Sequence, residues 1–198
     1  MRTLNDISGV ELRWAKPKRS KLQFELRAGQ TPDEDTGEPA LATMSWTRGS
    51  QAIGQWAGGE YRFSREGWLR PRALVRAATS PATDTVADAA AANTADEPIA
   101  TFAQHGGALT FPDGRTVLWK KPKRLANDRL WVDSAGTVLV SFHAGNWRTP
   151  VAVTSQFDAT ALPELPLLLL LGQYLLVLSS QDDEAAITAS VAAVIAST

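Results

Sequence analysis

Two short basic segments, nearly identical in sequence, are the best candidates in this chain for binding a ligand. Trp-Ala-Lys-Pro-Lys-Arg at 14–19 recurs as Trp-Lys-Lys-Pro-Lys-Arg at 119–124, with five of the six positions identical. Each proline fixes its φ and lacks a backbone donor, so each segment is expected in a turn or at a strand edge, with its basic side chains in solvent. Such side chains attract the phosphate of a lipid head group, a soluble ligand or nucleic acid. The predicted site residues for a phosphate or lipid head group are Lys16, Lys18, Arg19, Lys120, Lys121, Lys123 and Arg124.

The two segments also have a purely structural interpretation. Lysine and proline at an exposed strand edge keep that edge from pairing with another chain, and the sequence leaves both interpretations open. If a pseudo-twofold axis relates the two parts of the chain, the segments share one rim and form a basic patch. Such a patch would be local, because 20 basic and 21 acidic side chains give the whole chain a net charge of -1.

Other groups suited to chemistry are few. Cysteine is absent, which excludes disulfides, thiolate metal sites and cysteine nucleophiles. His105 and His143 are the only histidines, and neither stands in a metal-binding spacing. The chain has neither a Gly-x-Ser-x-Gly elbow nor a Gly-x-x-x-x-Gly-Lys phosphate loop. We therefore expect no catalytic residue, no metal site and no cofactor, and an enzyme with a hidden site is kept as a further alternative.

Tryptophan is the other unusual residue type, with seven copies. Exposed indoles stack on nucleic-acid bases or lie at a lipid interface, whereas buried indoles fill the core of a β domain. We favour core filling. A nucleic-acid-binding module that combines the basic segments with exposed indoles is the alternative function. The tryptophans are Trp14, Trp46, Trp56, Trp68, Trp119, Trp131 and Trp147.

The elements that must position these residues are mostly strands. At 22–27 apolar residues alternate with polar ones, as in a strand with one buried and one solvated face. Turn sequences such as Gly58-Gly59 and Asp113-Gly114 separate the segments. Many short strands joined by tight turns predict a mainly β protein with C-terminal helices, an antiparallel β-barrel of two related halves. Further strands are expected at 40–46, 52–56, 60–64, 68–76, 99–104, 108–111, 116–120, 129–133, 138–143 and 151–156.

The length allows one domain or two small ones, and a single domain over residues 1–198, built from two related halves, is expected. Its halves are 1–76 and 97–157, each with one basic segment and one copy of a weaker echo, Glu-Pro-Ala at 38–40 and Glu-Pro-Ile at 97–99. The order of segment and echo differs between the halves, which indicates a permuted duplication. Residues 77–96 are rich in Ala, Thr and Asp and can bury little apolar surface, so a flexible loop is predicted there.

Two C-terminal helices are predicted after the strands. Residues 163–179 start with prolines that suit a first helical turn and continue with apolar side chains on every side, so this helix must be buried all round. Its apolar run, 165–178, is shorter than the about 20 residues that span a bilayer. Ser179 or Ser180 is expected to cap a second, amphipathic surface helix at 182–196, whose first turn is acidic.

A barrel of short strands in two halves, with a buried apolar helix near the C-terminus, resembles the tubby C-terminal-like superfamily, which includes the LURP-one-related proteins and the phospholipid scramblases. The resemblance covers about 12–178 and is carried by the strands, the duplicated basic segment and the apolar helix. It implies a closed barrel that encloses a central hydrophobic α-helix. Tubby proteins bind phosphoinositide head groups through basic side chains, whereas scramblases use acylated cysteines and calcium. This chain lacks cysteine and a run of acidic calcium ligands, so scramblase activity is not expected.

These patterns predict a non-catalytic binding or scaffold domain. The expected partner is an anionic membrane surface or a phosphorylated ligand, with nucleic acid less favoured, and the oligomeric state is left open. A chain without cysteine, and without a signal-peptide apolar region among its first twelve residues, is expected in the cytoplasm, peripheral at the membrane if it binds lipid.

Overall fold

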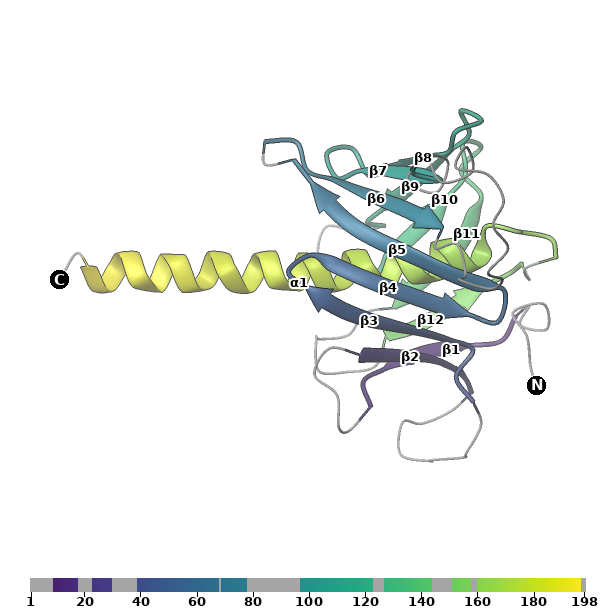
Figure 1. Ribbon diagram of the computed structural model, residues 1–198, viewed down its shortest axis with the longest axis horizontal. Helices are drawn as coiled ribbons and strands as arrows, with labels where there is room; N and C mark the ends of the chain where they lie inside the picture. The colour runs from purple at the N-terminus through teal and green to yellow at the C-terminus, as the bar shows by residue number, and fades with distance from the viewer. Residues whose placement is uncertain are drawn as a thin grey trace, which may run out of the picture.

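The computed structural model describes residues 9–17, 23–29, 39–67, 69–77, 97–122, 127–143, 151–157 and 160–196, with the side chains of the last helix described as far as Asp183. Within these residues the chain forms twelve strands and one helix (Figure 1). The elements are β1 (Leu12–Ala15), β2 (Gln23–Ala28), β3 (Ala42–Arg48), β4 (Gln51–Trp56), β5 (Gly59–Glu66), β6 (Arg72–Ala77), β7 (Ala100–Ala103), β8 (Ala108–Thr110), β9 (Thr116–Lys120), β10 (Arg129–Val132), β11 (Val138–His143), β12 (Val151–Ser155) and α1 (Leu165–Ala196).

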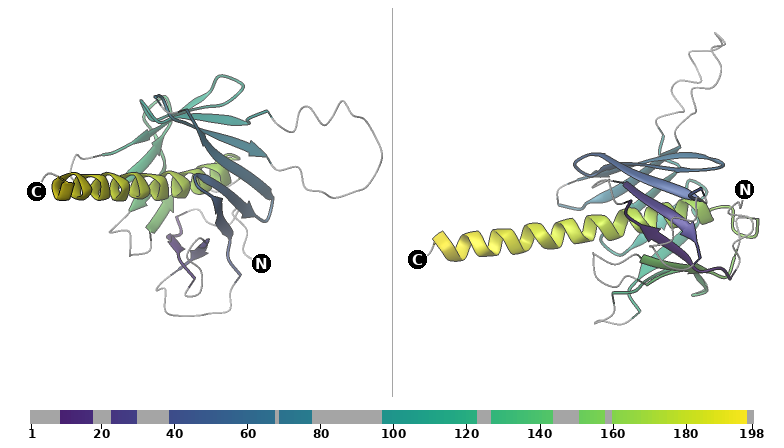
Figure 2. Two further views of the ribbon diagram at one scale, coloured as in Figure 1. Left: turned by 60° about the vertical axis from the view of Figure 1, so that its left-hand side comes forward. Right: turned by 90° about the horizontal axis from the view of Figure 1, so that it is seen from below.

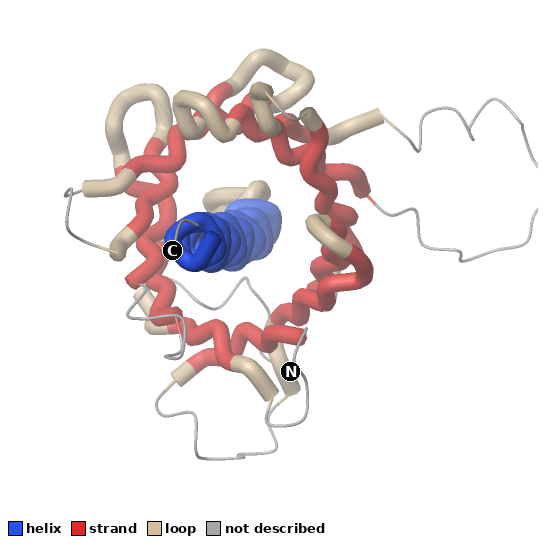
Figure 3. Tube along the Cα trace, turned by 90° about the vertical axis from the view of Figure 1, so that its left-hand side faces the viewer, coloured by secondary structure: helices blue, strands red, loops and turns tan. Residues whose placement is uncertain are grey.

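The strands form one closed antiparallel barrel (Figure 3). Each strand pairs with the next one in the chain, and β1 closes the ring by pairing with β12, with Leu12 opposite Val153. A closed ring leaves no free edge strand. The predicted fold class is therefore confirmed. The predicted loop at 77–96 lies outside the described residues except for Ala77, which ends β6.

Alternation along the strands separates the inside of the barrel from its outer wall. In β3, Ala42, Met44 and Trp46 are buried, whereas Thr43 and Ser45 between them are partly exposed. Burying a large apolar side chain stabilises the fold by roughly 1.5–3 kcal/mol. A shift of one residue in the register would turn every buried side chain outward, so this pattern fixes the inner face of each strand.

The helix α1 begins inside the barrel and runs through its centre (Figure 2, Figure 3). Residues 167–171 are all leucine and at most 3% exposed. Because strands surround this part of the helix, it can be apolar on every side without meeting water. The expected central hydrophobic helix is confirmed. Leu165–Asp183 is long and apolar enough to cross a membrane, yet 67% of that stretch is buried inside the protein.

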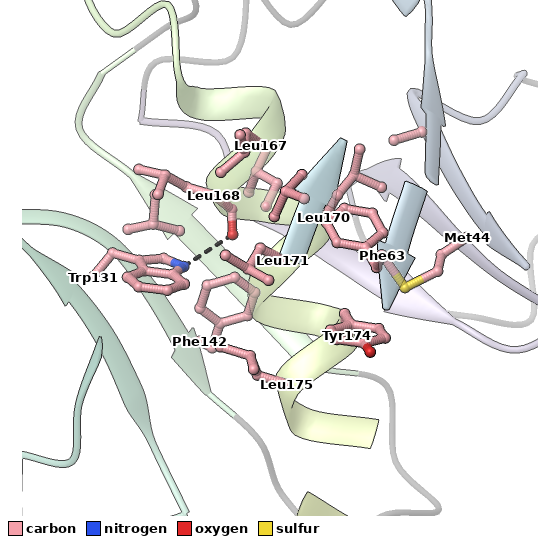
Figure 4. Close-up of a cluster of buried hydrophobic side chains, with 14 of the residues drawn as sticks. Met44, Phe63, Trp131, Phe142, Leu167, Leu168, Leu170, Leu171, Tyr174 and Leu175 are labelled. Atoms are coloured by element: carbon pink, nitrogen blue, oxygen red, sulfur yellow. Dashed lines mark hydrogen bonds between the residues drawn. The ribbon is translucent and has the colours of Figure 1, made fainter. Parts of the chain in front are cut away.

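Close contacts fix the helix against the wall of the barrel. The ring of Phe142 on β11 lies where a side chain at position 172 would begin, so only glycine fits there without a shift of the ring. On β10, the Trp131 indole N–H donates a hydrogen bond of 2.9 Å to the carbonyl oxygen of Leu168 (Figure 4). The barrel interior is thus occupied by helix and wall side chains in direct contact.

The prediction of two C-terminal helices is wrong, because α1 continues unbroken through the expected boundary. Ser179 and Ser180 do not cap a new helix. Their hydroxyls donate to the carbonyl oxygens of Leu176 and Val177, three residues earlier, at 2.9 Å and 2.8 Å. Serine hydroxyls satisfied in this way are tolerated inside a helix, and the acidic residues that follow lie in its middle.

The two rims of the barrel can be assigned from strand direction. Neighbouring strands are all antiparallel, so the odd-numbered strands run one way and end at one rim. Since α1 follows β12, it begins at the opposite rim and leaves the barrel where the odd strands end. We name these the start rim and the exit rim. The exit rim consists of the described residues 15–17, 23, 48–51, 66–67, 69–72, 103–108, 120–122, 127–129, 143 and 151. The start rim consists of the described residues 28–29, 39–42, 56–59, 77, 97–100, 110–116, 132–138 and 155–157.

Side-chain contacts agree with this direction of the helix. Just before α1 begins, Glu164 forms an ion pair with Arg115 in the β8–β9 turn of the start rim. Further along, the Tyr174 hydroxyl donates to the carbonyl oxygen of Ser50 in the β3–β4 turn of the exit rim. Past the rim, Asp182 accepts from Arg65 near the end of β5 at 2.8 Å.

Candidate functional site

The described residues of both basic segments lie at the exit rim. Lys16 follows the last residue of β1 and is exposed. Lys120 is the last residue of β9 and Lys121 follows it, and both are exposed. β1 and β9 are both odd-numbered, so they end at the same rim. Lys18, Arg19, Lys123 and Arg124 lie outside the described residues.

A tryptophan that packs inside the barrel precedes each set of lysines. Trp14 is 1% exposed and points into the barrel two positions before Lys16. Trp119 is partly buried, and its ring lies 4.6 Å from that of Trp131 and 5.3 Å from that of Phe142. Because side chains alternate along a strand, an inward Trp119 turns Lys120 outward. The aromatic residue of each segment is therefore structural, and the cations that follow face solvent.

The remaining tryptophans favour core filling over stacking on a ligand. Trp46 and Trp131 are buried, and Trp56 is partly buried and stacks on Tyr61 with ring centroids 4.5 Å apart. None of the five tryptophans in the described part of the chain is exposed. Trp68 and Trp147 lie outside the described residues.

The exit rim holds further cations that the sequence analysis missed. Arg48 ends β3 and is exposed, and Arg70 in the β5–β6 turn is exposed beside Leu69, whose exposed fraction is 85%. Isolated arginines give no motif in sequence. They become recognisable only when the strand order puts these turns on one rim.

The described acidic side chains at the exit rim do not pair with these cations. Within the described residues, no carboxylate forms an ion pair with Lys16, Arg48, Arg70, Lys120 or Lys121. The Lys16 ammonium instead lies 5.3 Å from the centre of the Phe24 ring, a favourable cation–π contact. Nearby acids are already engaged by other groups, as Glu66 is by Arg72 and Arg76. The exit rim therefore presents net positive charge to solvent.

The connections at the two rims differ in composition. The connections from odd to even strands, at the exit rim, contain one acidic residue in the sequence, Asp128. Their basic residues are Lys16, Lys18, Arg19, Lys21, Arg70, Lys121, Lys123, Arg124 and Arg148. The connections from even to odd strands and from β12 to α1, at the start rim, contain one basic residue in the sequence, Arg115. Their acidic residues are Asp33, Glu34, Asp35, Glu38, Asp84, Asp88, Asp96, Glu97, Asp113, Asp133, Asp158 and Glu164. A chain that is nearly neutral overall thus distributes its charges unevenly between two classes of connection.

Carboxylates of the start rim are held in their charged form by local donors. The backbone N–H of Arg115 donates to Asp113 at 3.0 Å, and this bond, with that of the Arg115 guanidinium, lowers the pKa of Asp113 below its ordinary value. The backbone N–H of Thr137 donates to Asp133 at 2.7 Å and lowers the pKa of that carboxyl in the same way. This rim stays anionic at neutral pH.

The groups that sequence analysis considered for catalysis do not converge. His105 lies exposed in the β7–β8 turn, and His143 lies exposed at the end of β11, with its Nδ1 3.6 Å from Asp128 Oδ1. Both face solvent at the exit rim. In the part of the chain that the structure describes, no group of three His, Cys, Asp or Glu side chains could hold a metal ion.

Buried polar groups inside the barrel serve packing. Burial raises the pKa of Tyr174 well above its ordinary value, and burial with the charge of Glu164 raises the pKa of Tyr61 to about 12. Both phenols therefore stay neutral at physiological pH. Tyr174 stacks on Trp46 and Phe63, which places its hydroxyl at the rim rather than in a reactive pocket.

Comparison with known proteins adds no relative, since no family model, curated protein or solved structure matches this chain. The positions and charges of the exit-rim residues are therefore the basis for a functional assignment.

Proposed function

We propose that this protein is a non-catalytic binding domain whose exit rim recognises the phosphate groups of anionic phospholipids. The observation that carries the proposal is that Lys16, Lys120 and Lys121, from two segments about a hundred residues apart, are exposed at one rim without an acidic partner among the described residues. Cations near an anionic membrane surface contribute about 1 kcal/mol each to binding.

The spacing of the lysines favours a surface over a single small anion. Three strands, β10, β11 and β12, separate β9 from β1 around the ring. At about 4.8 Å between neighbouring strands, the two segments lie roughly 19 Å apart along the wall. A small phosphate contacts groups within about 3 Å of its oxygens, whereas a bilayer offers many phosphates over that width. The proposal therefore names a lipid surface, with free phosphate as an outcome of the test.

The architecture supports the proposed kinship with the tubby C-terminal-like superfamily. A closed twelve-strand barrel around an apolar helix is what that resemblance implies. Fold alone does not carry function, so the lipid proposal stands on the charged rim. A cytoplasmic protein that is peripheral at the membrane agrees with a cysteine-free chain.

The test is co-sedimentation of the full chain with phosphatidylcholine vesicles, with and without phosphatidylserine or a phosphoinositide. The variant Lys16→Gln/Lys120→Gln/Lys121→Gln should lose about 100-fold in affinity for anionic vesicles, since three contributions of about 1 kcal/mol amount to two factors of ten. The control Thr110→Glu/Ser134→Glu/Ala135→Glu lowers the net charge equally at exposed positions of the start rim and should bind like the wild type.

Four outcomes would overturn or replace the proposal. Equal binding to neutral and anionic vesicles would show that the rim charges do not contribute to membrane binding. Equal binding by the lysine variant and its control would show the same. Complete release of the vesicles by millimolar inorganic phosphate at constant ionic strength identifies a soluble phosphate ligand. Tighter binding to an oligonucleotide than to vesicles, lost in the same lysine variant, identifies a nucleic-acid-binding module.

A further inference from the structure

The C-terminal part of α1 leaves the barrel and continues beyond the ends of the described strands. Figures 1 and 2 show the helix extending far beyond the ends of the strands. The side chains of Gln181, Asp182 and Asp183 are exposed just past the exit rim. The helical backbone then runs on to Ala196, and no residue after Glu184 is charged.

This projecting stretch is unusual in composition for a helix in water. From 185 to 196 it consists of alanine, isoleucine and valine with one threonine and one serine. A stretch of this length is marginal as a helix unless its apolar residues are covered. Within one copy of the described chain, the strands all end before it (Figure 1). A lipid phase or a partner outside the barrel is what would remove these apolar residues from water.

The charge around the helix indicates what covers it. The exit rim that surrounds its base carries Lys16, Arg48, Arg70, Lys120 and Lys121. A second copy would offer apolar side chains to the helix but would bring a second cationic rim and no phosphate. An anionic bilayer offers apolar chains to the helix and phosphates to the rim. Leu69, exposed beside Arg70, adds an apolar side chain at the same level.

The length of the stretch fits one leaflet. Twelve residues at 1.5 Å each extend about 18 Å, against about 15 Å for half of a hydrocarbon core of about 30 Å. The polar residues 181–184 precede it, so they would lie at the level of the head groups. Of these, Asp182 is paired with Arg65 at 2.8 Å, which offsets its repulsion from anionic lipid.

We propose that residues 185–196 of α1 insert into one leaflet of an anionic bilayer, with the exit rim against the head groups and the start rim facing away. This inference rests on the proposed function for its lipid partner but assigns a separate, apolar contribution to binding. Rim attraction weakens with salt, whereas helix insertion persists. The two contributions can therefore be measured apart.

The experiment measures binding of the full chain to phosphatidylserine-containing vesicles at low salt and at about 1 M salt, where the Debye length is about 3 Å. The variant Ile187→Asp/Val191→Asp should lose the salt-resistant binding at least tenfold. Its control, Ser134→Asp/Ala135→Asp at the start rim, should retain it. Thermal unfolding of both variants should match the wild type, because residues 187 and 191 lie beyond the barrel.

The outcomes separate the two proposals. Equal binding by the helix variant and its control at both salt concentrations overturns the insertion, while the lysine variant still tests the rim. Loss of salt-resistant binding in the helix variant, together with unchanged low-salt binding in the lysine variant, supports insertion and removes the proposed rim function. A wild-type dimer in sedimentation velocity that Ile187→Asp/Val191→Asp converts to a monomer, with no vesicle binding, overturns insertion in favour of a second copy.

Discussion

The two parts of α1 have similar apolar composition and opposite surroundings. Residues 165–178 lie inside the barrel, where most of their side chains are buried. Residues 185–196 continue the same helix beyond the strands (Figure 1). A helix that is apolar all round needs an apolar environment. The barrel provides it for the first part, and we propose that a lipid leaflet provides it for the second.

A long apolar helix can therefore have two parts that require different apolar surroundings. The boundary is short and polar, from Ser179 to Glu184, and the exit rim lies around it. Asp182 is tied to the wall there through Arg65. Substitutions on either side of this boundary should therefore differ in their effect on the free energy of unfolding.

The largest contrast is expected between matched truncations in the two parts. Leu170→Ala should lower the free energy of unfolding by about 2–5 kcal/mol, because Leu170 is fully buried and leaves a cavity. Ile187→Ala should change it by less than about 0.5 kcal/mol, because that position lies beyond the barrel. Urea unfolding followed by tryptophan fluorescence measures both. Similar losses from the two substitutions would show that the projecting part packs within the protein.

A second substitution probes the contact between helix and wall. Gly172→Ala should destabilise the protein by about 1–3 kcal/mol, although alanine favours helix, because the new methyl group overlaps the buried Phe142 ring. The double variant Gly172→Ala/Phe142→Leu should lose less than the sum of its single changes in the same unfolding assay. Additive losses would mean that the ring does not limit the approach of the helix.

A smaller effect is expected at the boundary itself. The Arg65–Asp182 pair is partly exposed, with side-chain exposures of 27% and 47%, so its coupling energy should be about 0.2–1 kcal/mol. A double-mutant cycle with Arg65→Gln and Asp182→Asn measures it in thermal unfolding. A coupling energy of zero at low salt would indicate that the wall does not hold the helix at this level.

The smallest effect concerns the start rim and pH. The pKa of Asp133 is lowered by the backbone N–H of Thr137 below its ordinary value of 3.8. The stabilisation from this bond is therefore fully present above the unfolded-state pKa and is lost as the pH falls through the lower folded-state pKa. Asp133→Asn should be less stable than the wild type at pH 7, and the difference should shrink below about pH 4. A difference in melting temperature that is constant from pH 7 to pH 2 would contradict this assignment.

Much of the barrel could be predicted from the sequence, because a strand with one buried face shows alternation. The predicted segments at 52–56, 116–120 and 138–143 coincide with β4, β9 and β11. β1 was not predicted, since four residues are too few for alternation to stand out. The segment predicted at 68–76 begins too early, because the described residues 69–71 lie outside the sheet and β6 starts at Arg72.

The helix and the site were less accessible to sequence analysis. Ser179 followed by acidic residues is typical of a helix start, whereas in the structure α1 runs unbroken through it and its hydroxyl donates to the Leu176 carbonyl. The shared rim was expected from a pseudo-twofold axis. It arises instead because β1 and β9 are both odd strands of a closed antiparallel ring, which the spacing of the lysines along the chain does not reveal.

In the proposed arrangement, the exit rim faces an anionic bilayer and the end of α1 lies in one leaflet of that bilayer. The chain has no cysteine, so Ile187→Cys and Ser134→Cys each provide one site for an environment-sensitive fluorophore. On addition of phosphatidylserine-containing vesicles, the emission at position 187 should shift to shorter wavelength and become protected from an aqueous quencher, whereas position 134 at the start rim should not change. No shift at 187, or an equal shift at both positions, would contradict the account.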